Sequence, residues 1–302
     1  MSDNASISWE ELSTAEGTQD ARSVKSPWQE VVRRFRRNRL AVLGLIVLII
    51  LCILSLLTPW IAPYDPAAID LFDIQSPPSP EHWMGTDDLG RDVLTRLMYG
   101  SRVTLSVAVA ATAIGVLAGV VLGGIAGYYG GLLDTLIMRF IDVMLSFPTL
   151  FLLIILSAYV KATILGIVAI IGFTSWMGIA RLVRGELLSL KEKEFVEASH
   201  AIGARDARII FRHLIPNAMG PVIVAGTLNV GYAILYESSL SFLGVGIQPP
   251  AASWGNMLTN AQSYVTSAPW LAFWPGILIF VTVLCFNFVG DGMRDALDPK
   301  LK

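Results

Sequence analysis

The chain has 302 residues, of which 54% are hydrophobic and 15% charged, and its formal net charge is −2. The mean hydropathy is +0.61, far above that of a typical soluble protein. This composition excludes a soluble globular domain and predicts an integral membrane protein. The net charge indicates no class of partner, because the basic residues are concentrated in a few segments between apolar runs.

The first 39 residues precede the first apolar run and divide into two parts. Residues 1–26 are rich in Ser, Thr, Asp and Glu, which predicts a disordered tail. Residues 28–39 interleave arginines with large apolar side chains, which predicts an amphipathic helix on an anionic membrane surface. The next run, residues 40–62, is too long for a signal peptide and lacks a cleavage site, so we expect an uncleaved first transmembrane helix.

Six runs of about 20 residues are apolar enough to cross a bilayer. They are residues 40–61, 103–128, 143–160, 163–180, 218–235 and 270–289. The sequence therefore predicts an all-α integral membrane protein with six transmembrane helices, whose core occupies residues 103–290. Cys52 and Cys285 lie within these runs, so we expect buried thiols rather than a disulfide or a metal site.

The basic residues also predict the orientation of the chain. If the N-terminus is cytoplasmic, 18 of the 22 Lys and Arg residues lie on the cytoplasmic side and four lie outside. The four outside are Arg91, Arg96, Arg102 and Lys161. Cytoplasmic loops carry the excess of basic residues, so we expect both termini, including the tail of residues 291–302, in the cytoplasm.

Residues 63–102 are expected to form an external loop, which is rich in proline and in acidic residues. Thr86 or Asp87 is a candidate cap for a helix that begins just afterwards. Arg91 and Arg96 can pair with neighbouring carboxylates. We interpret the loop as structural, because among His and Cys residues only His82 stands near the acids that a metal or catalytic site would need.

The second and third runs carry backbone signals. In the second, Gly115, Gly119, Gly123 and Gly127 repeat every four residues, so they share one helix face and let a neighbouring helix approach closely. We interpret this face as a packing surface. In the third, Pro148 predicts a kink, which suits a gate as well as ordinary packing.

A polar segment, Glu194 to Pro216, separates the fourth and fifth runs. Its first part predicts a short amphipathic helix that Gly203 ends. One helix face is expected to hold Phe195, Ala198, Ser199 and Ile202, and another Glu194 and Glu197. In the second part, Arg205, Arg208 and Arg212 share a face of a further helix that runs into Pro216. The segment therefore predicts a helix, a turn and a helix on the membrane surface.

The end of the fifth run and the loop after it carry two further candidates. Glu237 lies in the outer half of an apolar segment, where an acid is a candidate for function. A carboxylate capped at the interface is the alternative. Trp254, in a loop without Lys or Arg, belongs to a re-entrant or surface element that suits contact with a solute pathway or an external protein.

Glu197-Ala198-Ser199, followed after three residues by Gly203 and later by Ile215-Pro216, resembles the EAA loop of membrane subunits of ABC importers. This sequence departs from the family pattern at Ser199, His213 and Ile215. In that family the loop docks on a separate ATPase subunit. The resemblance implies a coupling loop within residues 186–216, on which Ala201 is expected to be accessible.

Two further stretches resemble one branch of this family. Gly85-Thr86-Asp87 with Gly90-Arg91-Asp92 resembles permeases of the peptide and nickel branch, and Gly290 to Lys300 resembles the C-type permease of oligopeptide and dipeptide importers. The resemblance implies a type I importer fold and a place in the bacterial inner membrane. It also implies a second homologous permease, two ATP-binding subunits that hold ATP and Mg, and an extracytoplasmic peptide-binding protein. Dipeptide, nickel or another small solute is the alternative cargo.

The sequence lacks the motifs of several other functions. It has no G-x-x-x-x-G-K-[ST] loop, so the chain is not expected to bind ATP itself. It has no H-E-x-x-H or G-x-S-x-G motif, so we expect no enzyme activity, no cofactor and no metal in this chain, and no binding of nucleic acid. An ATP-independent channel or transporter and a non-transporting scaffold remain alternatives.

Overall fold

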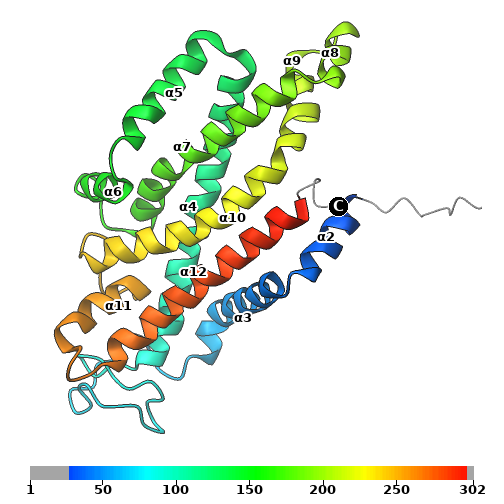
Figure 1. Ribbon diagram of the computed structural model, residues 1–302. Helices are drawn as coiled ribbons and strands as arrows, with labels where there is room; N and C mark the ends of the chain where they lie inside the picture. Colours follow the sequence, from blue (N-terminus) through cyan, green and yellow to red (C-terminus); the bar gives the residue numbers. More distant parts are fainter. Residues whose placement is uncertain (1–26, 298–302) are drawn as a thin grey trace, which may run out of the picture.

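The computed structural model describes residues 27–297, which form a helical protein (Figure 1). Within this range no strand is present, and only an isolated bridge joins Thr86 to Asp92. The predicted all-α fold is therefore confirmed. The helices are α2 (Pro27–Arg37), α3 (Arg39–Ile61), α4 (Val93–Tyr129), α5 (Gly131–Leu145), α6 (Thr149–Ser157), α7 (Ile164–Lys191), α8 (Glu194–Ala201), α9 (Asp206–Ile209), α10 (Ile215–Phe242), α11 (Trp254–Ala261) and α12 (Trp270–Leu297). The disordered tail predicted for residues 1–26 lies outside the described residues, as do residues 298–302.

Five of these helices are long and apolar enough to cross a membrane, and the bent pair α5 and α6 makes a sixth candidate. The sequence predicted a third span over residues 143–160 with a kink at Pro148, and the chain does break at this proline. The structure has two helices there, which meet at an angle of 90°. Pro148 precedes α6 and lacks an N–H, so the α5 helix cannot continue through it. The Ser146 hydroxyl donates to the Asp142 carbonyl, 2.7 Å away, at the end of α5.

The longest transmembrane helix is α4, with 37 residues and a length of about 55 Å. It begins at Val93, inside the region that the sequence predicted as a loop to residue 102. The Asp92 side chain caps the helix by accepting from the Thr95 N–H at 2.7 Å. Neither Thr86 nor Asp87 is the cap. The outer loop is therefore residues 62–92, and the last ten predicted loop residues are helical.

The glycine face of α4 lies directly against α7. A Cβ added at Gly119 would stand 2.7 Å from Cβ of Ile179, and one at Gly127 would stand 2.9 Å from Cβ of Leu187. Gly115 and Gly123 meet α7 in the same way, at Ser175 and Ala180. Helices separated by so little space gain extensive van der Waals contact, which is the main attraction between helices in lipid.

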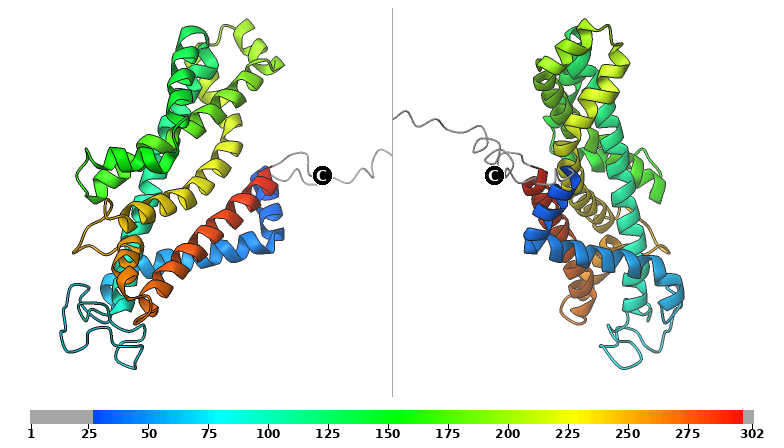
Figure 2. Two further views of the ribbon diagram at one scale, coloured as in Figure 1. Left: turned by 60° about the vertical axis from the view of Figure 1, so that its left-hand side comes forward. Right: turned by 90° about the vertical axis from the view of Figure 1, so that its right-hand side faces the viewer.

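The remaining long helices form a second group, with α12 packed against both α10 and α3. Gly44 of α3 approaches the backbone of α12, since a Cβ there would lie 3.0 Å from the Cys285 carbonyl. Figure 2 shows α2 and α3 beside α12, at the edge of the molecule. Asn38 separates α2 from α3 and caps α3 by accepting from the Ala41 N–H at 3.1 Å.

The two ends of the molecule differ. Helices α8 and α9 lie together at one end, whereas residues 62–92 and α11 lie at the opposite end (Figure 1). The largest apolar core joins α4, α7, α10, α11 and α12 near the loop end. A smaller core of nine buried residues lies beneath α8 and α9.

Candidate functional site

The polar segment, residues 194–216, forms α8, a turn, α9 and a π-helical turn (Ile210–Leu214) that leads into α10. Gly203 ends α8 with a φ of +77°, a left-handed conformation that glycine adopts at little cost. The Gly203 N–H donates to the His200 carbonyl at 2.9 Å, and the Ala204 N–H to the Ser199 carbonyl at 3.0 Å. This pair of bonds is the Schellman motif, which sets the angle between α8 and α9.

The faces of α8 differ from those expected. Val196 and Ser199 are buried against the protein, and the Ser199 hydroxyl donates to the Phe195 carbonyl at 2.7 Å. Phe195 is 40% exposed and Ile202 is 84% exposed, while Ala198 is exposed between them. The four residues expected on one face therefore lie on two sides of α8, because Ser199 is buried with Val196 whereas the other three are exposed. Phe195, Ala198 and Ile202 form an apolar surface patch, which we call the α8 patch.

Five of the six charged residues of the polar segment are exposed and make no side-chain hydrogen bond or ion pair within the described part of the chain; they are Glu194, Glu197, Arg205, Arg208 and Arg212. The sixth, Asp206, is exposed and accepts a hydrogen bond from Tyr128. Ala201 is exposed on α8. Single exposed hydrophobic side chains are common, but a contiguous apolar patch rimmed by unpaired charges is typical of a protein-binding surface.

Pro216 is the second residue of α10 and is exposed. Proline cannot donate a backbone bond to the preceding turn. The Asn217 side chain donates to the His213 carbonyl of that turn at 2.6 Å. The polar segment therefore continues into the long helix α10 without a loop between them.

Three helix ends meet at Tyr128, which the sequence did not single out. Its hydroxyl donates to Asp206 Oδ1 at 2.7 Å, and its carbonyl accepts from Lys191 Nζ at 2.8 Å. Lys191 Nζ also lies 5.5 Å from the centre of the Tyr128 ring. Residue 128 belongs to α4, residue 191 to α7 and residue 206 to α9. We call these bonds the Tyr128 tie, and we call the close contact of the α4 glycines with α7 the glycine seam. The tie therefore fixes the polar segment to both helices of the seam. No sequence pattern indicates a contact between residues so far apart.

Apolar contacts reinforce the tie. Val196, Ile209 and Leu214 are buried with Val183 and Leu187 of α7 in one cluster. Each fully buried aliphatic side chain contributes roughly 1.5–3 kcal/mol. The polar segment is thus firmly attached on one face and open on the other.

Ion pairs connect α5 to α7 close to the same end of the molecule. Arg184 forms a bidentate pair with Asp134, and Arg181 Nη2 lies 2.8 Å from Asp142 Oδ1. Arg139 Nη1 lies farther away, 3.9 Å from Asp142 Oδ2. The outer face of α5 remains exposed, with Leu132 82% accessible. These ion pairs, together with an apolar cluster in which Ile141 of α5 is buried against Trp176 and Met177 of α7, hold α5 on α7.

Glu237 and Trp254, the candidate pathway or external contacts, are both fully buried in the described chain, and their role stays a prediction. Glu237 accepts from the Thr104 hydroxyl at 3.0 Å and from the Ser241 hydroxyl at 2.8 Å. Trp254 donates its indole N–H to the Leu97 carbonyl at 3.2 Å, and its backbone N–H approaches the Thr104 hydroxyl at 3.3 Å. These bonds join α4, α10 and α11 into one unit, and neither side chain reaches the surface.

The loop end is organised around buried charges in residues 62–96, which we call the clasp. Asp87 Oδ2 lies 2.7 Å from Arg91 Nε and 3.3 Å from Arg96 Nε, and all three residues are almost completely buried. Asp87 Oδ1 also accepts from the backbone N–H groups of Leu89 and Arg91. The expected pairing of Arg91 and Arg96 with neighbouring acids is thus present.

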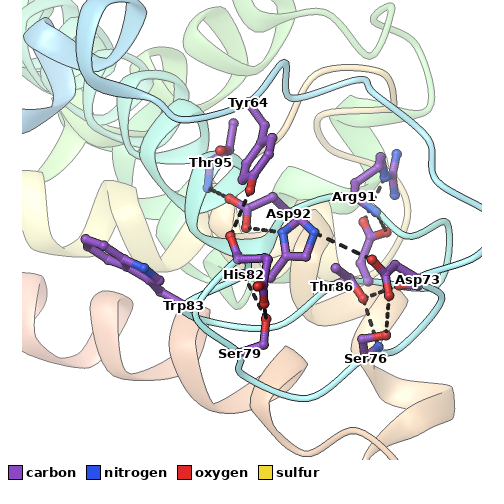
Figure 3. Close-up of polar contacts among 12 residues, drawn as sticks. Tyr64, Asp73, Ser76, Ser79, His82, Trp83, Thr86, Arg91, Asp92 and Thr95 are labelled. Atoms are coloured by element: carbon purple, nitrogen blue, oxygen red, sulfur yellow. Dashed lines mark hydrogen bonds and ion pairs between the residues drawn. The ribbon is translucent and has the colours of Figure 1, made fainter.

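A second set of contacts completes the clasp (Figure 3). His82 Nδ1 lies 3.0 Å from Asp92 Oδ1, and its ring packs on that of Tyr64 with 4.9 Å between centres. The Thr86 hydroxyl bonds to the Asp73 carbonyl and accepts from the Ser76 N–H at 2.8 Å. Three buried polar atoms of the clasp, Asp88 Oδ1, Thr95 Oγ1 and Arg96 Nη2, have no hydrogen-bond partner among the described residues. In the described residues no group of His, Cys, Asp and Glu side chains could hold a metal ion.

Two family models match the chain. Residues 119–302 match the inner membrane component of binding-protein-dependent transport systems. Residues 26–78 match the N-terminal transmembrane domain of oligopeptide transport permease C.

Curated relatives match nearly the whole chain. The oligopeptide transport system permease protein OppC of Bacillus subtilis is 41% identical over 277 residues, which cover 92% of this chain and 91% of the relative. The dipeptide transport system permease protein DppC of the same organism is 44% identical, covering 95% and 91%. The glutathione transport system permease protein GsiD of Escherichia coli O6:K15:H31 is 42% identical, covering 92% of each.

Solved structures show the same fold. An inward-facing crystal form of the MetNI methionine ABC transporter aligns with a TM-score of 0.57 and 20% identity, covering 68% of this chain and 97% of that chain. A second crystal form of that transporter gives a TM-score of 0.55, covering 66% and 94%. The chain therefore belongs to the family of inner membrane components of binding-protein-dependent transport systems, as a multi-pass ABC permease of the oligopeptide permease C type.

Proposed function

We propose that this chain forms, with a second homologous permease, the translocation pathway of an ATP-driven peptide importer. The relatives named above are described as permeases for oligopeptides, dipeptides and glutathione, all of which contain peptide bonds. A peptide is therefore the best-supported cargo. Another small solute carried by the same branch, nickel included, is the alternative.

The proposed orientation has both termini and the polar segment in the cytoplasm. It rests on the 18 of 22 basic residues that then lie on the cytoplasmic side. The clasp and α11 then lie outside, where an extracytoplasmic peptide-binding protein delivers its cargo. Two ATP-binding subunits supply the energy and hold ATP and Mg, and this chain carries no cofactor of its own.

One observation carries the coupling role: α8 is held by Val196 and Ser199 but leaves the α8 patch and its charges unsatisfied. A short helix that is anchored on one side and open on the other suits insertion into a cleft of an ATPase subunit. The Tyr128 tie and the glycine seam connect α8 to α4 and α7. A displacement of α8 therefore moves these two helices with it, as packed helices shift together in switching proteins.

The test is peptide uptake by the complete transporter in proteoliposomes, with Ile202→Glu compared with Ile202→Leu. Ile202 is 84% exposed, so neither change disturbs the fold of this chain. A buried charge at the contact with the ATPase is costly, and we expect Ile202→Glu to reduce ATP-dependent uptake at least about 100-fold. Ile202→Leu keeps the patch apolar and should transport normally.

Three results would count against the proposal. Normal uptake by Ile202→Glu would remove α8 from the coupling contact. Uptake by the permeases without their ATPase subunits would instead favour an ATP-independent channel or transporter. A complex that hydrolyses ATP but never accumulates peptide would favour a different cargo or a scaffold role.

A further inference from the structure

The break between α5 and α6, residues 145–148, lies on the surface of the described chain. The Phe147 side chain is 57% exposed, and the other three residues of the break are exposed as well. The carbonyl groups of Leu145, Ser146 and Phe147 accept no hydrogen bond from any described residue. The break therefore presents unpaired main-chain acceptors to whatever surrounds it.

Contacts between α5 and α7 show with which part of a transmembrane helix the break is level. Asp134 is paired with Arg184 in the first turn of α5, and further along α5 the Phe140 ring stacks on the Trp176 ring, with 6.1 Å between centres. The two helices therefore run antiparallel, and the break lies beyond Trp176. Residues 164–180 of α7 contain no Lys, Arg, Asp or Glu. The break is thus level with the uncharged part of a helix that is long and apolar enough to cross a membrane.

Unpaired main-chain groups at this level need water or protein around them. Lipid offers no hydrogen-bond donor, so irregular backbone inside a membrane occurs only where it is buried in protein or lines a water-filled cavity. A second permease packed directly on the break would bury three carbonyl groups for which the described chain supplies no donor. Water in a pathway between the two permeases satisfies all three.

A polar groove of about 330 Å³ continues from the break along α5. Its lining includes Asp134, Arg139 and Asp142. Asp142 lies one turn before the break, and its carbonyl accepts from the Ser146 hydroxyl at 2.7 Å. Asp134 lies in the first turn of α5, at the end of the molecule that also holds α8 (Figure 1). Polar groups therefore lead from the break to the end that we propose is cytoplasmic.

We propose that the break lines the translocation pathway between this chain and the second permease, and that its free carbonyl groups bind the main chain of the peptide in transit. This inference rests on the proposed function and adds the residues that face the cargo. Peptides carry main-chain N–H donors whatever their side chains are, so unpaired carbonyl groups suit an importer of peptides with varied sequences. Proteins that bind extended peptides at a sheet edge use main-chain hydrogen bonds in the same way.

The test is the rate at which a water-soluble methanethiosulfonate reagent modifies Ser146→Cys in the complete transporter in proteoliposomes. Cys52 and Cys285 of this chain are replaced by serine. The thiolate is the form that reacts, and it forms in water but not in lipid or in packed protein. We expect rapid modification, which unlabelled tetra-alanine at a saturating concentration slows at least about threefold by occupying the site.

Phe280→Cys in the same background is the matched control. Phe280 is 64% exposed on α12, which packs on α10 and α3 and lies away from the break. Lipid or the second permease covers such an exposed apolar position, so its modification should be slow. Tetra-alanine should leave that rate unchanged.

Two results would overturn this inference while the proposed function stands, with the unchanged transporter still accumulating radiolabelled tetra-alanine. Modification of Ser146→Cys as slow as that of the control would mean that lipid or the second permease covers the break, and a crosslink from the same cysteine to the second permease would identify the latter. Fast modification that tetra-alanine does not slow would place the break in water outside the pathway. If the unchanged transporter accumulates no peptide, the proposed function fails and this inference fails with it.

Discussion

The clasp and the polar segment lie at opposite ends of one chain and use their charges in opposite ways. In the clasp, Asp87 bonds Arg91 and Arg96 in a buried network. In the polar segment, five of the six exposed charged side chains have no partner among the described residues. Charges that are satisfied within the chain stabilise a rigid element, whereas charges left free beside an apolar patch are available to another protein. Variants at the two ends should therefore fail differently: a clasp variant that breaks the Asp87 network should lose stability, and variants of the α8 patch should fold but not transport.

The largest effect is expected for Asp87→Ala. It leaves two buried arginines without their carboxylate, and breaking a buried ion pair costs about 3–5 kcal/mol. Asp65, in the same loop, is exposed and accepts only from the Ala67 N–H at 2.8 Å, so Asp65→Ala is the matched control. Thermal unfolding in detergent should show a large loss of stability for the first variant and almost none for the second. Equal stability of the two variants would mean that the buried network does not brace the loop.

A second prediction concerns the glycine seam, which connects the two ends. Gly119→Ala places a Cβ 2.7 Å from Ile179, so α4 and α7 must separate, at a cost of about 1–3 kcal/mol. At Gly124, one turn further along, a Cβ would meet nothing closer than 4.0 Å. Gly124→Ala should therefore be neutral or slightly stabilising, since alanine is the better helix former. The midpoint of unfolding in detergent compares the two, and an equal loss would show that the seam is not closely packed.

The third prediction concerns the attachment of the polar segment to α4. Tyr128→Phe removes the bond to Asp206 but keeps the ring under Lys191. Asp206 is exposed and water replaces the lost donor, so the loss of stability should be only about 1 kcal/mol. Uptake should fall several-fold, because α9 is no longer fixed to α4. Unchanged uptake with a lower stability would make the tie merely structural.

The smallest effect is expected for Asp88→Asn, although Asp88 is the neighbour of Asp87, where the largest effect is expected. Burial, together with the negative charge of Asp87, raises the pKa of the Asp88 carboxyl. When the folded-state pKa of a carboxyl is raised, the free energy of unfolding of the protein falls as the pH rises from the unfolded-state pKa through the folded-state pKa. Asp88→Asn should therefore stabilise the protein at neutral pH, by less than about 1 kcal/mol, and lose this advantage in acid. The unfolding midpoints of the variant and the unchanged protein at neutral and acidic pH measure this difference in stability. A variant that is less stable than the unchanged protein at neutral pH would contradict the prediction.

Hydropathy predicted the membrane class and the fold class, because each span is a local property of the sequence. The sequence was less informative where contacts between distant residues determine the structure. The cap of α4 is Asp92 rather than Thr86 or Asp87, since those two residues are engaged in the clasp. The 90° bend between α5 and α6 exceeds an ordinary proline kink, and the sequence indicates a break but not its angle.

The candidate site was predictable only in part. Gly203 and the position of the polar segment between two spans follow from local sequence. The inward face of α8 is set by Val196, which is buried in one cluster with Leu187 and Leu214, and the buried Glu237 accepts from Thr104, 133 residues earlier in the chain. Such contacts leave no periodic signal. The coupling role of the polar segment stays a prediction, because it concerns a partner.

The most direct test of that role places a cysteine at Ala201, which is exposed on α8. Cys52 and Cys285 are replaced by serine so that the new thiol is the sole one in this chain. In membranes that contain the ATPase subunits, Ala201→Cys should crosslink to an ATPase subunit, and the yield should change when nucleotide is added. If a membrane-impermeant thiol reagent reaches the cysteine from the cytoplasmic side but no crosslink to an ATPase subunit forms, the polar segment is not the coupling contact.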